Sequence, residues 1–252
     1  MEYAYAGSSA IGASKSGKPA HPFIVNELHE EYYQLGAHGI LVSFDHSLFS
    51  FDLFNDCKLY RPLSLNSAVI KRQCEYFAGR YAARLALKKF NINAFDVKSA
   101  SDRSPVWPTS VIGSITHTSD TAMCIVLPNT RNSYVGVDIE DWLTTSIAND
   151  ICETIVADNE QVMLKTLNQP FAQLLTLVFS AKESLFKALF PFVKQFFGFD
   201  CAEIKSIDFC SNSFELMLTT TLSNELKKGM RFTGIFLPTT TNVRTQIMGS
   251  FD

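Results

Sequence analysis

The chain has 252 residues, 46% of them hydrophobic, which is enough to bury the core of one domain or of two modest ones. A formal net charge of −3 argues against a general nucleic-acid-binding protein, and no apolar run is long and charge-free enough to cross a bilayer. Six cysteines without C-x-x-C spacing, and no recognisable signal peptide, indicate free thiols in a reducing cytoplasm, with peripheral membrane association left open.

The first 60 residues carry few signals. Residues 1–20 are rich in Ala, Gly and Ser, so we expect a mobile arm. A β-rich run predicts the first strand at residues 40–45. Four histidines lie eight or nine residues apart, a spacing unlike that of familiar metal sites, and we interpret them as loop residues: His21, His29, His38 and His46.

Residues 66–90 predict a long helix that begins at Asn66 or Ser67 and has a basic polar face. Arg72 and Arg80 are eight residues apart, which a period of about 3.6 brings nearly onto one stripe. This face is either a solvated cationic surface or a clamp for an anion, because arginine presents a planar fork of donors suited to phosphate. Gly79 costs about 1 kcal/mol of helix propensity, which suggests that something approaches the backbone closely there.

A rigid polar loop with two prolines follows at residues 101–108, and strands are predicted at 111–118 and 122–127. His117 lies near the end of the first of these strands, with a threonine on each side. It either caps the core or donates a hydrogen bond to a phosphate oxygen.

Two carboxylates project from one face of a predicted strand at residues 134–141. Asp138 and Glu140 are two residues apart and therefore point the same way, while the other face is apolar. Neighbouring carboxylates repel each other. They are tolerated at a solvated strand end, or they share a hard cation such as Mg²⁺, and this segment alone leaves both possibilities open.

The rest of the chain is helical and then β. Three helices are predicted: one capped by Thr145 or Ser146, one that opens after Asp158, and one through the apolar run that Pro191 ends. An aromatic loop at 192–199 either packs in the core or lines a channel for a substrate arm. A meander of strands is predicted at 204–209, 214–220, 230–237 and 243–248.

The third helix carries Glu183 and Lys187, four residues apart and therefore on one face. The ordinary interpretation is an exposed pair that stabilises the helix by a few tenths of a kcal/mol. The surrounding apolar residues make a buried, paired or metal-bound arrangement the alternative. The element order predicts an α+β fold in two halves, with an arm at 1–20 and halves at 21–135 and 136–252.

Five segments together resemble one family: KRQCEYFAGR at 71–80, PVWP at 105–108, GSITH at 113–117, GVDIE at 136–140 and FSAKESLFKA at 179–188. They are similar to the 4'-phosphopantetheinyl transferases of the surfactin and enterobactin type, and most of all to the enterobactin synthase component D branch. The resemblance covers roughly residues 65–200. It implies pseudo-twofold-related α+β halves, with coenzyme A in the cleft between them and Mg²⁺ on its pyrophosphate.

The resemblance also implies roles for particular residues. The metal ligands would be Asp138, Glu140 and Glu183, and the catalytic residues Glu183 and Lys187. Lys187 would contact the pyrophosphate and Glu183 would relay a proton. The remaining coenzyme A contacts would be Arg72, Arg80, Thr116 and His117 at the adenosine-side phosphate, Arg103 and Pro105 near the adenine, and Gly198 and Phe199 at the pantetheine arm, with Asp138 near the pyrophosphate.

The implied reaction transfers 4'-phosphopantetheine to a serine of an apo carrier domain and releases 3',5'-ADP. The implied partners are aryl and peptidyl carrier domains of a siderophore synthase. The protein itself would be a monomer, either free or within a synthase complex. The alternatives are carriers of polyketide or fatty-acid synthesis, a metal-dependent phosphohydrolase, and a non-catalytic carrier-binding protein.

Overall fold

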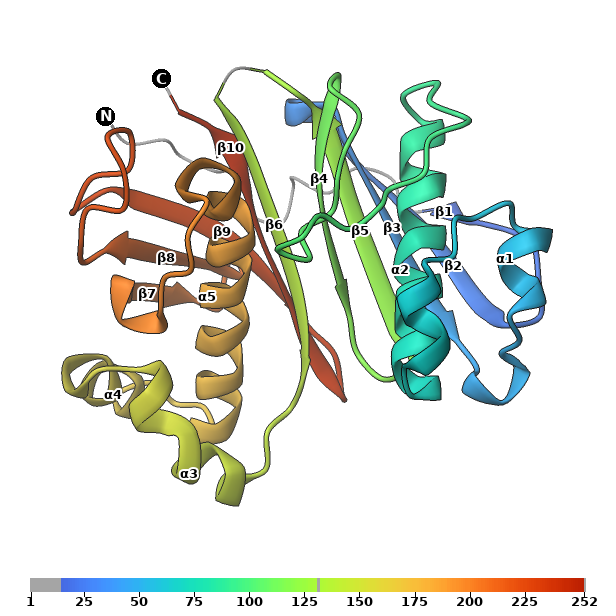
Figure 1. Cartoon of the computed structure of the whole chain (residues 1–252). Coiled ribbons are helices and arrows are strands. Elements are labelled where there is room, and N and C mark those ends of the chain that lie inside the picture. The colour runs from blue at the N-terminus through green and yellow to red at the C-terminus, as the bar shows by residue number, and fades with distance from the viewer. Residues whose placement is uncertain (1–14, 131, 252) are drawn as a thin grey trace. The chain divides into compact units, whose positions relative to one another are not determined.

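The computed structural model describes residues 15–130 and 132–251. The described chain divides into two compact units, one of them Tyr134–Met248 and the other the residues up to 133 together with those from 249 onward (Figure 1). Each unit is built on a five-stranded antiparallel sheet with helices, which confirms the predicted α+β class. Of the arm predicted at 1–20, residues 1–14 lie outside the described residues, and Lys15–Ser16 forms a short strand.

The N-terminal sheet has the strand order β1-β2-β3-β5-β4. Its strands are β1 (Lys15–Ser16), β2 (Ile24–Tyr32), β3 (Ala37–Phe44), β4 (Val111–His117) and β5 (Thr121–Pro128). Between them lie short helices η2 (Tyr33–Leu35), η3 (His46–Leu48) and α1 (Asp52–Asp56).

The prediction that the first strand lies at residues 40–45 is wrong, because β1 and β2 precede it. β2 escaped the pattern because it buries two carboxylates: Tyr81 donates to Glu27 at 3.0 Å and Tyr32 donates to Glu30 at 2.7 Å. The loop assignment of the histidines is also wrong for three of them. His29 lies in β2, His38 in β3 and His46 in η3.

Helix α2 (Ile70–Lys88) packs against β3, β4 and β5 through a buried face that includes Phe77, Ala82 and Ala86 (Figure 1). Its predicted start at Asn66 or Ser67 is wrong, because Leu63–Ser67 forms a separate 3-10 turn, η4. A Cβ atom on Gly79 would lie 2.9 Å from Cγ2 of Ile115 in β4. The glycine therefore lets β4 pack close to the helix backbone, as its cost in helix propensity suggested.

The C-terminal sheet has the strand order β6-β10-β9-β8-β7. Strands β7 (Ala202–Asp208), β8 (Ser213–Leu218), β9 (Arg231–Pro238) and β10 (Asn242–Ser250) confirm the predicted meander, and β6 (Ser133–Asp141) pairs beside β10.

The helices of this unit are α3 (Thr145–Ile155), α4 (Asp158–Lys165) and α5 (Phe171–Val193), with a 3-10 turn η5 (Phe199–Cys201) before β7. The Thr144 side chain, not that of Thr145 or Ser146, accepts the capping hydrogen bond at the start of α3. Pro191 does not end α5, because a proline in the last turn removes only one hydrogen bond, and the helix stops at Lys194 with a left-handed φ of 56°.

All six cysteines lie in the described part of the chain and are free thiols, as predicted. Among the described residues, no helix has both the length and the apolar character that crossing a membrane requires.

Candidate active site

Helix α5 lies unusually close to strand β6. A Cβ atom on Gly136 would fall 1.8 Å from the Ser184 carbonyl oxygen, a separation that real Cβ atoms do not adopt. Glycine at this position therefore lets the strand backbone touch the helix backbone. The contact brings Asp138, two residues further along β6, against the turns of α5 that carry Ser180 and Lys187.

Asp138 is almost completely buried, and both of its carboxylate oxygens are engaged. Lys187 Nζ donates to Oδ1 at 2.6 Å, and Ser180 Oγ donates to Oδ2 at 2.9 Å. Thr245 Oγ1 lies 2.8 Å from the hydroxyls of both Ser180 and Ser184, which extends the network into β10. A charged pair held by this many fixed partners has one geometry.

Glu140 and Glu183 lie close enough to Asp138 to be affected by its charge. Burial, then the charge of Asp138 and that of Glu183, raises the pKa of Glu140 to about 8, against the opposing charge of Lys187. Burial and, less strongly, Asp138 also raise the pKa of Glu183, again against Lys187. The site therefore holds more carboxylates than its single lysine can neutralise.

A divalent cation fits this donor set chemically. In residues 15–130 and 132–251, no three His, Cys, Asp or Glu side chains are grouped closely enough to hold a metal ion as they stand. However, burial and the charge of Asp138 raise the pKa of both Glu140 and Glu183, and a hard cation would neutralise such a group of carboxylates. Mg²⁺ needs only one or two protein carboxylates. Asp138, Glu140 and Glu183 are the residues that would hold it.

In the N-terminal unit, the end of β4 meets the start of α2. Arg72 NH1 donates to His117 Nε2 at 2.8 Å, so the histidine presents a lone pair to the guanidinium. Glu75 lies behind both side chains, with its Oε2 3.7 Å from Arg72 NH1 and 3.6 Å from His117 Nδ1. Half of the Arg72 side chain is exposed. The predicted pair of phosphate ligands is thus adjacent and partly open to solvent.

Arg80 lies two turns further along α2. It donates to Ser99 Oγ at 2.9 Å, and its guanidinium lies 4.7 Å from the centre of the Tyr76 ring. Burial lowers the pKa of Arg80, and its buried Nε has no hydrogen-bond partner among the described residues. A half-buried cation with a spare donor suits an anionic ligand.

The loop after α2 folds back toward Arg80. Ser99, the hydrogen-bond partner of Arg80, forms an isolated β-bridge with Pro105. Arg103, at the tip between them, has a left-handed φ of 69° and donates its N–H to the Ala100 carbonyl. Thr116 is buried in β4 beside His117.

Gly198 and Phe199 lie just before β7. The Gly198 carbonyl accepts from the Cys201 N–H at 3.1 Å, and the Phe199 ring lies 5.5 Å from the Phe179 ring of α5. The Phe199 carbonyl accepts from Lys182 Nζ at 3.2 Å. This turn is therefore docked on the same helix that carries Glu183 and Lys187.

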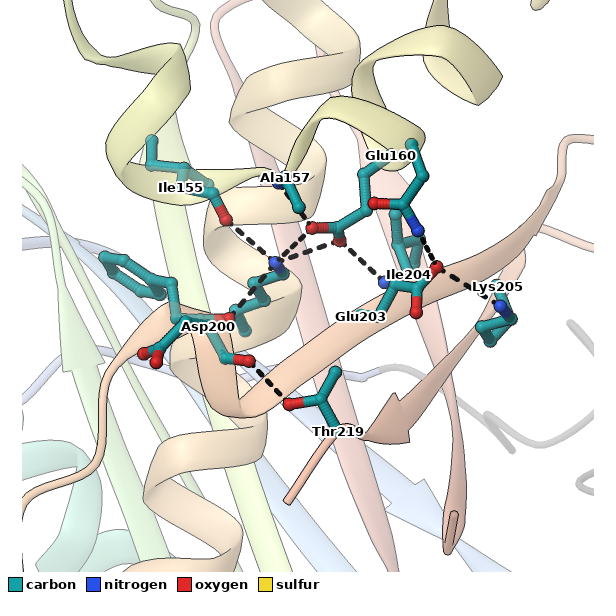
Figure 2. A network of polar contacts seen from close by, with 11 residues as sticks. Ile155, Ala157, Glu160, Asp200, Glu203, Ile204, Lys205 and Thr219 are labelled. Carbon is teal, nitrogen blue, oxygen red and sulfur yellow. Dashed lines mark hydrogen bonds and ion pairs between the residues drawn. The ribbon is translucent and has the colours of Figure 1, made fainter. Parts of the chain in front are cut away.

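Lys182 forms a buried ion pair that the sequence did not predict (Figure 2). Its Nζ lies 2.9 Å from Glu160 Oε1, and both side chains are 2% exposed. It also donates to the Ile155 carbonyl at 2.8 Å, while Glu160 accepts from the backbone N–H groups of Ala157 and Ile204, each at 2.8 Å. Burial lowers the pKa of Lys182, and Glu160 opposes this effect.

Sequence reasoning missed four residues that shape these sites: Glu75, Ser180, Thr245 and Glu160, the partner of Lys182. One signal was available for Ser180, which stands four residues before Ser184 and therefore on the same face of a largely apolar helix. No comparable signal marked Thr245 or Glu160, because their partners are distant in sequence.

Comparisons with known proteins agree with this picture. Residues 61–127 match the family described as the 4'-phosphopantetheinyl transferase N-terminal domain, and residues 134–231 match the 4'-phosphopantetheinyl transferase superfamily. The first match contains Arg72, Arg80 and His117, and the second contains Asp138 and Lys187.

Curated relatives match over part of the chain. Enterobactin synthase component D of Salmonella typhi is 38% identical over 61% of this chain and 63% of its own length. The protein of that name from Escherichia coli O157:H7 is 37% identical over 55% of this chain and 67% of its own length. The 4'-phosphopantetheinyl transferase Npt of Nocardia iowensis is 29% identical over 54% of this chain and 60% of its own length.

The chain therefore spans a little under two thirds of the length of the Salmonella relatives. Each unit of the described fold contains a match to a 4'-phosphopantetheinyl transferase family model, and the Escherichia coli relative is matched over two thirds of its length. The chain belongs to the 4'-phosphopantetheinyl transferase superfamily.

Proposed function

We propose that this protein transfers the 4'-phosphopantetheine group of coenzyme A to a serine of apo carrier domains. The observation that carries the proposal is the junction of β6 and α5, where Lys187 holds Asp138 at 2.6 Å beside Glu140 and Glu183. This is a cation next to an excess of carboxylates, the arrangement that pyrophosphate chemistry uses. Family membership and the names of the relatives support the same reaction.

In the proposed reaction, the serine Oγ of the carrier attacks the β-phosphorus of coenzyme A. The new Oγ–P bond forms as the bridging P–O bond breaks, and 3',5'-ADP leaves with the electron pair. Glu183 takes the serine proton as the general base. Lys187 faces the oxygen on which negative charge develops, which is where a fixed cation lowers the barrier most.

Mg²⁺, held by Asp138, Glu140 and Glu183, would supply Lewis-acid stabilisation of the pyrophosphate oxygens. Lys187 would then exchange its contact with Asp138 for one with a phosphate oxygen. Its side chain is 27% exposed, against 4% for Asp138, so a phosphate oxygen would reach the lysine more readily than the aspartate.

The N-terminal unit would bind the adenosine-side phosphates through Arg72, Arg80 and His117, with Thr116, Arg103 and Pro105 around them. Replacing Arg72 by Ala should raise KM for coenzyme A about 10- to 100-fold, the usual value of a hydrogen bond to a charged group. The matched control is dephospho-coenzyme A, which lacks the 3'-phosphate. The substitution should change the KM for dephospho-coenzyme A far less. An equal rise in KM for both substrates would show that Arg72 does not bind the 3'-phosphate.

The proposed partners are aryl and peptidyl carrier domains of a cytoplasmic siderophore synthase, because the component D relatives are named for enterobactin synthase. Gly198 and Phe199 are the proposed contacts of the pantetheine arm. Association with a membrane surface or a synthase complex would be a further property of the same enzyme.

The test is incubation of apo carrier domains with coenzyme A and Mg²⁺, read by intact mass. The expected result is a phosphopantetheine adduct on an aryl or peptidyl carrier and none on the Ser→Ala carrier. Modification of a polyketide or fatty-acid carrier alone would assign the enzyme to polyketide or fatty-acid synthesis instead of siderophore synthesis. Coenzyme A breakdown without a carrier would indicate a phosphohydrolase, and no adduct on any carrier would refute the transferase.

A further inference from the structure

The Lys182–Glu160 ion pair connects segments that the proposed function uses separately. Lys182 immediately precedes Glu183 in α5, and its ammonium group reaches away to the end of α3, to α4 and to the turn before β7. An ammonium group has three N–H donors, and this one has three acceptor groups: the Ile155 carbonyl, the Glu160 carboxylate and the Phe199 carbonyl. Its orientation is therefore fully specified.

Glu160 fixes the other side of the pair just as completely. Oε2 accepts from the Ala157 N–H at the start of α4, and Oε1 accepts from the Ile204 N–H in β7 (Figure 2). Removing the carboxylate would free two backbone donors in addition to the lysine. The pair thus joins five segments of the C-terminal unit at one buried point: the end of α3, α4, α5, the turn at Phe199, and β7.

The turn at Phe199 is attached to α5 twice. Its carbonyl binds Lys182, and its ring packs on Phe179, which lies one helical turn before Glu183. The peptide that carries Glu183 and the turn that carries Gly198 and Phe199 are therefore held at a fixed separation.

We propose that Lys182 and Glu160 are positioning residues for the transfer reaction: their ion pair sets the distance between Glu183 and the Phe199 turn. The inference rests on the proposed function. Neither residue would touch the reacting atoms. Their effect would be to keep the proton acceptor and the pantetheine arm aligned, and small misplacements of aligned groups are costly in rate.

The experiment compares Lys182→Met, Glu160→Gln and the double variant with two controls. Lys205→Met makes the same substitution at a partly exposed lysine that contacts Glu203 in the neighbouring part of the network. Leu164→Ala opens a cavity at a fully buried position of α4 and leaves both charges of the ion pair in place, so it serves as a control for the loss of stability.

In the network variants kcat should fall on the order of 100-fold, the cost of misplacing aligned groups, while KM for coenzyme A changes little because Arg72 and His117 are untouched. Hydrogen exchange should accelerate at residues 198–204. Lys205→Met should match the wild type in both measurements, and Leu164→Ala should lose thermal stability with only a small loss of kcat.

Three outcomes would overturn the inference. These are a folded Lys182→Met protein with wild-type kcat, a kcat loss no larger than that of Leu164→Ala at the same loss of Tm, or unchanged exchange at 198–204. If Lys182→Met does not fold, the double variant, which buries no unpaired charge, is judged by the same criteria. A wild-type protein that modifies no carrier would refute the proposed function alone, and exchange at 198–204 would still decide whether the pair anchors the turn.

Discussion

Lys187 has a carboxylate four residues before it in the helix and another on the neighbouring strand. The ion pair in the structure is with the strand residue, Asp138, at 2.6 Å. Burial explains the choice. The Asp138 side chain is 4% exposed, so its charge requires a partner. Burial raises the pKa of Glu183, which favours the neutral form of that carboxyl and lessens its need for a cation. The lysine therefore belongs to the carboxylate cluster rather than to a surface helix pair.

Replacing Lys187 by Ala should reduce transfer more than it reduces stability. We expect kcat to fall on the order of 100-fold or more, because a fixed charge facing the developing anion is lost. The free energy of unfolding should fall by about 1–3 kcal/mol, since Ser180 still donates to Asp138. Carrier modification and urea unfolding measure the two effects, with Lys187→Arg as the charge-preserving control. A Lys187→Ala protein that lost stability but kept the specific activity of the wild type would restrict Lys187 to a structural role.

Glu140 should make the metal-free protein less stable as the pH rises. Its ordinary pKa of 4.5 applies in the unfolded chain, and the fold raises it to about 8. Between these values the unfolded chain gives up the proton while the folded chain keeps it, so the free energy of unfolding falls with increasing pH. The contribution of Glu140 is intact below the lower value and lost above the upper one.

The measurement is urea unfolding from about pH 5 to about pH 8 without added Mg²⁺, comparing the wild type with Glu140→Gln. The substitution should flatten the profile in this window. Identical slopes in the two proteins would show that the Glu140 carboxyl is not the group that titrates.

At the scale of elements, the contact between β6 and α5 positions the site. Gly136 lets the strand backbone reach the Ser184 carbonyl, and Asp138 then falls beside Ser180 and Lys187. The apolar residues of α5 supply the packing, but the missing side chain of Gly136 sets how close the helix comes. Loss of this closeness would pull the lysine from the aspartate.

Gly136→Ala should destabilise the protein by at least about 3 kcal/mol, at the upper end for overpacking, because the obstacle is backbone rather than a side chain that can rotate. Thermal unfolding measures this. Gly198→Ala is the stability control, since its Cβ would meet the side chain of exposed Asp200, which can swing away. Equal melting temperatures for the two variants would contradict the close contact.

At the scale of the whole molecule, the last residues of the chain group with the N-terminal unit rather than with the C-terminal sheet from which they emerge. Phe251 donates its N–H to the Asn132 carbonyl at 3.0 Å, and Asn132 Nδ2 donates to the Phe251 carbonyl at 3.1 Å. These two bonds join positions 119 residues apart. The chain end thus contributes to the unit that holds Arg72 and His117.

Removing residues 251 and 252 should lower the free energy of unfolding by about 1–2 kcal/mol, the value of two ordinary hydrogen bonds. Asn132→Ala should have a smaller effect, and combining the two changes should cost less than their sum because both remove the side-chain bond. Denaturant unfolding of the three proteins tests this. Strict additivity would mean that the two residues do not interact.

Local sequence patterns predict many of the helices and strands of this molecule. Runs of strand-forming residues predicted β4 to β10, and a period of two predicted the side shared by Asp138 and Glu140. Helical spacing predicted α2 and the apolar run of α5, because this period follows from backbone geometry alone. The motifs at 71–80, 113–117, 136–140 and 179–188 identified the family without any knowledge of the fold.

The tertiary structure decided which charges meet. The partner of Lys187 is 49 residues away and that of Lys182 is 22 residues away, and nothing in the local sequence marks either pairing. Strand β2 was hidden because its buried glutamates are satisfied by tyrosine hydroxyls, one from Tyr32 of the same strand and one from Tyr81 of α2. Burial makes an unpaired charge costly, so partners are selected by what the folded core brings within reach, and periodicity does not encode that selection.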